Sequence, residues 1–146
     1  MALPDFGPLG DLAPGVYRAE LHEVLARFGS AGGSRGRCTR DLAHVYELAR
    51  RTGRLERFLV FGSYVTAKPD PNDVDIILVM DDNFRLEACP MELRGLFDHA
   101  VAQARYGASV FWTRPSILIG ETVDEFLAYW QVKRDKSRRG IVEVVA

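Results

Sequence analysis

The segment that decides the fold runs from Phe58 to Met80 and reads FLVFGSYVTAKPDPNDVDIILVM. It begins with a short apolar run, Phe58–Phe61, which is typical of a buried strand. The run stops at a Gly-Ser pair, after which comes a polar connector rich in Pro, Asp and Asn. A second apolar run, Val74–Met80, then follows. The segment therefore predicts two buried strands joined by a sharp turn and a polar connector.

Two acids stand where the second apolar run begins, Asp73 and Asp75. Side chains alternate along a strand, so these two point the same way, with Cα atoms roughly 6.5 Å apart. Two carboxylates on one side of an apolar strand repel each other and are costly to desolvate. A divalent cation relieves both costs, and Mg²⁺ prefers such carboxylates together with substrate phosphates. We therefore predict that Asp73 and Asp75 are metal ligands and catalytic residues for Mg²⁺ or Mn²⁺.

The Gly-Ser pair has the properties of a phosphate-binding turn. Gly62 lacks a Cβ, so a phosphate could approach the backbone closely, and Ser63 could donate a hydrogen bond to it. Lys68 in the connector could reach a phosphate, although a solvated loop lysine is the more ordinary interpretation. The pattern predicts a phosphate-binding site formed by Gly62, Ser63 and Lys68.

The composition of the whole chain sets broad limits. The protein has 146 residues, 47% of them hydrophobic, and a formal net charge of -1, so no global positive field favours a long nucleic acid. Cys38 and Cys89 are not at metal-ligand spacing, which fits a reducing compartment. No basic leader and no apolar run of about 20 residues is present. We expect a cytoplasmic protein that does not enter a membrane, whose oligomeric state is left open.

Apolar periodicity and turn residues predict the remaining elements. Residues 1–15 are rich in Pro and Gly and should form an extended arm before a single domain, 16–146. The expected elements are a helix over 16–28, a mobile Gly-rich loop over 29–37, a helix capped by Thr39 and ending near Thr52 before Gly53, a helix from Pro90 to just before Gly107, a strand over 108–113, a helix over 122–131 and a strand over 141–145. This order predicts an α/β (α+β) fold, with a small mixed sheet of about four strands and helices packed mainly on one face.

The arrangement of the central motif resembles that of nucleotidyltransferases of the DNA polymerase β type. The shared features are FGS, nine residues, and then DVDI. The small, minimal members of the superfamily are the most similar, and a wider likeness to an uncharacterised bacterial family of such proteins spans most of the chain. The resemblance implies that Gly62 and Ser63 bind a nucleoside triphosphate and that Asp73 and Asp75 bind the metals. It also implies a protein or tRNA acceptor and a bacterial toxin–antitoxin or defence context.

One departure from that superfamily leaves two functions open. Its active members usually carry a third acid on a neighbouring strand, whereas no Asp or Glu occurs here between Asp98 and Glu121. Asp81, Asp82 or Glu121 could substitute from a loop. The first hypothesis is a metal-dependent nucleotidyltransferase acting on a hydroxyl of a protein or RNA. The alternative is a catalytically degenerate fold that serves as a nucleotide- or protein-binding module.

A basic cluster precedes the last predicted strand, comprising Lys133, Arg134, Lys136, Arg138 and Arg139. Charges beside an edge strand commonly serve solubility, which is the interpretation we favour. Contact with RNA or polyphosphate is the functional alternative.

Overall fold

The computed structural model describes residues 3–146, which form one mixed sheet flanked by helices. The strands are β1 (Val16–Glu20), β2 (Leu55–Phe61), β3 (Val74–Met80), β4 (Ala108–Thr113) and β5 (Ile141–Val145). The helices are α1 (Leu21–Phe28), α2 (Gly33–Arg51), α3 (Met91–Arg94), α4 (His99–Tyr106) and α5 (Val123–Trp130). The strand order is β1-β5-β2-β3-β4. The outer pairs β1–β5 and β3–β4 are parallel, whereas β2 is antiparallel to both of its neighbours.

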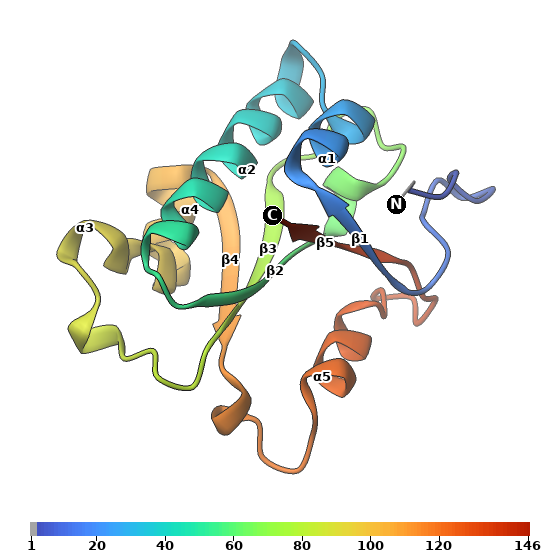
Figure 1. Ribbon diagram of the computed structural model, residues 1–146. Helices are drawn as coiled ribbons and strands as arrows, with labels where there is room; N and C mark the ends of the chain where they lie inside the picture. Colours follow the sequence, from blue (N-terminus) through green and yellow to red (C-terminus); the bar gives the residue numbers. More distant parts are fainter. Residues whose placement is uncertain (1–2) are drawn as a thin grey trace.

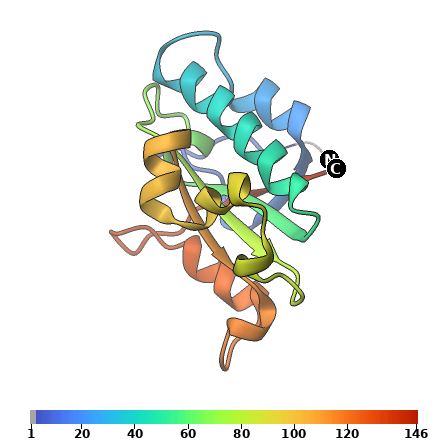
Figure 2. The same cartoon turned by 90° about the vertical axis from the view of Figure 1, so that its left-hand side faces the viewer.

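Helices cover the two faces of the sheet unequally. Figure 1 and Figure 2 show α5 across the sheet from α1 and α2. On the side of α1, α2 and α4, strand residues such as Phe58, Ile76 and Val142 join a large apolar core. On the other side, Leu59 and Ile77 pack with Leu127 of α5 in a smaller core. The α/β class and the concentration of helices on one face are thus confirmed, while the sheet has five strands rather than four.

The additional strand comes from a segment that we predicted to be helical. Val16–Glu20 pair in parallel with Ile141–Val145, and the helix begins only at Leu21. Apolar spacing alone suggested one helix from residue 16, but the partner strand lies more than a hundred residues away and cannot be inferred from local periodicity. Glu20 ends the strand and caps α1, because its side chain and that of Glu23 form a reciprocal capping box.

The Gly-rich loop is much shorter than predicted. Helix α2 begins at Gly33, so Thr39 lies inside the helix rather than at its start. The Thr39 hydroxyl bonds the carbonyl of Arg35 and the hydroxyl of Tyr64 (2.8 Å). Tertiary contacts of this kind stabilise a helical turn that its glycines would disfavour in isolation. Gly53 has a φ of 69°, as expected for a residue that follows a helix.

The helix predicted from Pro90 is divided in two. α3 ends at Arg94, a short 3₁₀ turn follows, and Asp98 caps α4 by accepting a hydrogen bond from the backbone N–H of Val101 (3.1 Å). The predicted strands over 108–113 and 141–145 and the helix near 122–131 are confirmed to within one residue at each end.

The N-terminal arm has neither helix nor strand over residues 3–15, yet it packs against the domain. Leu12 is buried, and its carbonyl accepts a hydrogen bond from the N–H of Gly140 (2.8 Å). The carbonyl of Gly10 accepts one from Ala67 (2.9 Å), close to the Gly-Ser turn. Among the described residues, none of the helices has the length and apolarity needed to cross a bilayer.

Candidate functional site

The Gly-Ser turn and the acid pair lie against each other at one end of the sheet. Strand β2 ends at Phe61, whose register partner on β3 is Asp75. Gly62 follows with a φ of 77° and starts a 3₁₀ turn, Gly62–Val65. A Cβ placed on Gly62 would overlap the Asp75 carboxylate. The absence of a side chain at residue 62 therefore allows the Asp75 carboxylate to lie directly against the turn.

Asp73 and Asp75 are both half-buried and lie near a hydroxyl of the next strand. Ser109 on β4 is the register partner of Asp75, and its hydroxyl donates a hydrogen bond to Asp73 Oδ2 (2.9 Å). The same hydroxyl lies 2.8 Å from Gln103 Oε1. Because it carries one hydrogen, it serves one acceptor at a time, and the bond to the carboxylate is the stronger. Ser109 thus orients one of the two acids, a role that the sequence did not reveal.

The environment of the pair disfavours charge on Asp75. Burial is the largest cause, and the neighbouring Asp73 adds to it, so the pKa of Asp75 is raised to about 7. The positive charge of Arg139 opposes the rise in the pKa of Asp75. Two carboxylates held together at this cost form a site whose charge a dication would balance.

None of the loop acids considered as substitutes reaches this pair. Asp81 and Asp82 follow the far end of β3, about 20 Å from Asp75 along the strand. Glu121 is exposed and precedes α5. Within residues 3–146, no group of three or more His, Cys, Asp or Glu side chains is placed to hold a metal.

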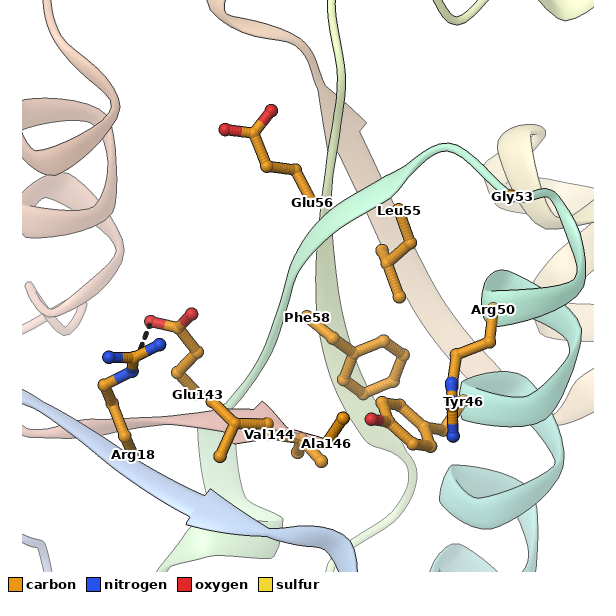
Figure 3. A pocket seen from close by; sticks show the side chains of 11 residues that line it. Arg18, Tyr46, Arg50, Gly53, Leu55, Glu56, Phe58, Glu143, Val144 and Ala146 are labelled. Atoms are coloured by element: carbon orange, nitrogen blue, oxygen red, sulfur yellow. Dashed lines mark ion pairs between the residues drawn. The ribbon is translucent and has the colours of Figure 1, made fainter.

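Glu143 on β5 is a buried acid, but it belongs to a different part of the sheet. It accepts a hydrogen bond from Arg57 Nη2 (2.7 Å), and Arg18 lies 4.0 Å away. Figure 3 shows this carboxylate facing Arg18 at the edge of a cavity of about 400 Å³. That cavity is lined by Leu55 and Phe58, in the half of β2 remote from Gly62. The Glu143 carboxylate is thus paired with two arginines, Arg57 and Arg18, at a distance from the acid pair.

The connector after the Gly-Ser turn is fixed by the N-terminal part of α2. Arg35 donates hydrogen bonds to the carbonyls of Tyr64 (2.7 Å), Thr66 (3.1 Å) and Lys68. Arg37 donates one to the carbonyl of Asn72 (2.8 Å), the residue before Asp73. Both arginines fall within the segment 29–37, for which the sequence predicts a mobile loop. The structure shows instead that they position the backbone between the turn and the acids.

A cavity of about 390 Å³ opens beside Ser63 and carries three cations. Lys68 lines it and is exposed, whereas the other two cations, Lys133 and Arg139, are half-buried. Lys133 is paired with Asp11 of the arm (2.9 Å), which is the one acid among the described residues that line the cavity. Arg139 Nε is buried and has no hydrogen-bond partner within residues 3–146. We name this cavity, with its three cationic side chains, the cation cavity.

No local pattern in the sequence predicts the cation cavity. Lys133 and Arg139 belong to the basic cluster that we attributed to solubility, and they are separated from Ser63 by about seventy residues. They come together because the segment before β5 returns to the end of β2. Arg134, Lys136 and Arg138 of the same cluster are exposed, as a solvated segment would be.

Comparison with known proteins places the chain in one family. A family model matches residues 4–145 and is described as a family of unknown function, DUF6932. Searches of curated proteins and of solved structures gave no match. Because the matched region spans nearly the whole sequence, the chain belongs to the family of unknown function DUF6932.

Proposed function

We propose that this protein binds a nucleoside triphosphate with a divalent cation and transfers its nucleotidyl group to a hydroxyl of a protein or RNA acceptor. The observation that carries the proposal is the contact between Gly62 and the Asp75 carboxylate. It brings a potential phosphate-binding turn and two potential metal ligands into one small volume.

The donor set suits Mg²⁺ or Mn²⁺ with substrate oxygens completing the shell. Asp73 and Asp75 offer carboxylate oxygens, which are the ligands that such ions prefer, and Mg²⁺ is commonly bound by one or two carboxylates plus phosphates. A bound cation would neutralise charge on the phosphate oxygens. Near the acids, Ser63 provides a hydroxyl for the remaining phosphates, and the cation cavity provides the charges of Lys68 and Arg139, because Lys133 is paired with Asp11.

The proposed reaction is an in-line substitution at the α-phosphorus. The acceptor oxygen forms a bond to this phosphorus, while the bond from the phosphorus to the oxygen bridging the α- and β-phosphates breaks. Pyrophosphate leaves with that oxygen, and the acceptor proton passes to solvent. The role of Ser63 and the cation cavity is to bind and orient the leaving phosphates.

Metal-dependent binding of triphosphate is the first test. Calorimetric titration with ATP, GTP, CTP and UTP in the presence of Mn²⁺ should give binding that chelation of the metal abolishes. Asp73→Asn should weaken it by at least about tenfold, because one carboxylate ligand is lost. Asp70→Asn, at an exposed acid in the same connector, is the matched control and should leave affinity unchanged. Equal binding by wild type and Asp73→Asn would contradict the proposal.

A second candidate is a binding module that holds the nucleotide without turnover. The observation that favours it is the identity of residue 109, because the register partner of Asp75 is a serine and not a third carboxylate. A serine hydroxyl is a poor metal ligand and a poor base.

Ser109→Asp distinguishes the two candidates. It places a third carboxylate opposite Asp75, so we expect Mn²⁺ to bind about tenfold tighter than in wild type. Transfer of label from α-³²P triphosphates to bacterial protein or RNA should be measured for both proteins. Transfer by wild type supports the enzyme, whereas transfer by Ser109→Asp alone supports the binding module. Ser109→Asn, of similar size and neutral, is the control.

A further inference from the structure

A row of aromatic rings runs from the start of α4 across β4 to the end of α5, and its Phe111 side chain lies on the same face of the sheet as the acid pair. His99 packs on Phe111 with ring centroids 5.0 Å apart, and Phe111 packs on Trp130 at 4.8 Å. Tyr129 meets Trp130 edge-on at 5.8 Å. We name these four residues the aromatic ledge.

The aromatic ledge begins next to the acids. Phe111 follows Ser109 by two positions on β4, so the two side chains share one face about 6.6 Å apart. Ser109 bonds Asp73, and Phe61, the register partner of Asp75, packs on Trp130 (5.0 Å). If the phosphate of a ligand lies at the acids, the Phe111 ring is therefore about the length of one sugar away from that phosphate.

Burial separates the aromatic ledge from the core beneath it. Leu127 and Phe61 are 1% and 8% exposed and already attach α5 to the sheet. Tyr129 is 71% exposed, His99 is also exposed, and Phe111 and Trp130 keep part of their surface in solvent. The packing of α5 on the sheet explains why the inner side chains are apolar. It does not explain why aromatic side chains also lie at the surface beside two carboxylates.

The order of strands places Phe111 of the aromatic ledge and the cation cavity on opposite sides of the acids. The cation cavity lies beside the end of β2, with Arg139 on the segment entering β5, whereas Phe111 lies on β4. The acids on β3 lie between them. A nucleotide has this layout, with a polyanion at one end and a flat apolar ring at the other.

We infer that the aromatic ledge binds an unpaired nucleobase by stacking. The inference rests on the proposed function for the position of the phosphates. Stacking is tolerant of base identity, because every base has a π face, so all four nucleotides should be accepted. The base is either that of the triphosphate or one at an unpaired RNA end.

The test compares ligands with and without a base in the presence of Mn²⁺. Nucleoside triphosphates should bind about tenfold or more tighter than inorganic tripolyphosphate. Phe111→Leu should remove this difference while leaving the affinity for tripolyphosphate unchanged. Phe126→Leu is the matched control, because Phe126 also contacts Trp130 (6.0 Å) but lies one helical turn nearer the start of α5.

Tryptophan emission gives an independent readout. The protein has two tryptophans, and Trp112 packs on Phe84 and Phe97 in the opposite core. In a Trp112→Phe background, a base-bearing ligand should quench Trp130, and tripolyphosphate should not. Competition between a triphosphate and a short single-stranded RNA for this quenching shows which of them supplies the base.

The outcomes separate the two proposals. If triphosphate and tripolyphosphate bind equally and Trp130 emission is unchanged, the aromatic ledge is refuted while the proposed function stands. If no triphosphate binds, quenching by RNA that Phe111→Leu abolishes still supports the aromatic ledge. The absence of any response to a base-bearing ligand overturns it.

Discussion

Replacing Gly62 by alanine is expected to destabilise the folded protein by about 2–4 kcal/mol. Two costs combine. The φ of 77° is unfavourable for a residue with a side chain, and the added Cβ would overlap the Asp75 carboxylate. The carboxylate must move away from the turn, so metal-dependent binding should fall as well. Chemical denaturation gives the loss of stability, and calorimetry gives the loss of binding.

Gly53 provides the matched control for this experiment. Its φ of 69° imposes similar backbone strain, but a Cβ there meets nothing within 4 Å among the described residues. Gly53→Ala should therefore cost only about 1 kcal/mol, and the difference between the two variants isolates the contact with Asp75. Combining Gly62→Ala with Asp75→Ala should cost less than the sum of the single changes. Equal effects of the two glycine substitutions would show that the turn and the carboxylate are not in contact.

Replacing Asp75 by asparagine should stabilise the metal-free protein above pH 7 and abolish its response to metal. Burial and the neighbouring Asp73 raise the pKa of Asp75 to about 7 in the folded state, well above the ordinary value of 3.8. Between these values the folded state binds more protons than the unfolded state, so the free energy of unfolding of the wild type falls as pH rises. Asparagine removes this dependence because it does not titrate.

The size of this stability effect follows from the rise in the pKa of Asp75. It is smaller than the full pKa shift would give, because the carboxyl group is partly exposed. We expect the free energy of unfolding of Asp75→Asn to exceed that of the wild type by on the order of 2 kcal/mol at pH 8 and to equal it near pH 4. Mn²⁺ should stabilise the wild type at pH 8 and leave Asp75→Asn unaffected, because a ligand that binds the folded state raises its stability. Denaturation curves at several pH values measure both effects. A wild-type stability that is level between pH 4 and pH 8 would contradict this account.

The sequence predicted the central part of the fold because the relevant signals are local. Val74–Met80 is an uninterrupted apolar run of strand length, and it forms β3 over the same residues. Thr122 and Glu125 give α5 a capping box that can be seen in four residues. The shared face of Asp73 and Asp75 follows from the alternation of side chains along a strand.

The mistaken elements are those that depend on distant partners. Val16–Glu20 form a strand because β5 lies beside them. Residues 33–37 are helical although they include two glycines, and Arg35 and Arg37 are bound to carbonyls of the connector. In both places, contacts between segments far apart in the chain decide the conformation against the local preference.

By itself, the sequence determined the two strands, the Gly-Ser turn and the pair of acids, since each depends on a few consecutive residues. Only the tertiary structure decided what surrounds them. Arg139 lies near the acid pair, and the Ser109 hydroxyl donates a hydrogen bond to Asp73. Aromatic rings from β4 and α5 pack together next to Ser109. These neighbours come from β4, α5 and the segment before β5, and strand order and register bring them together. Such long-range pairing leaves no periodic pattern in the sequence, which is why the acids could be predicted and their neighbours could not.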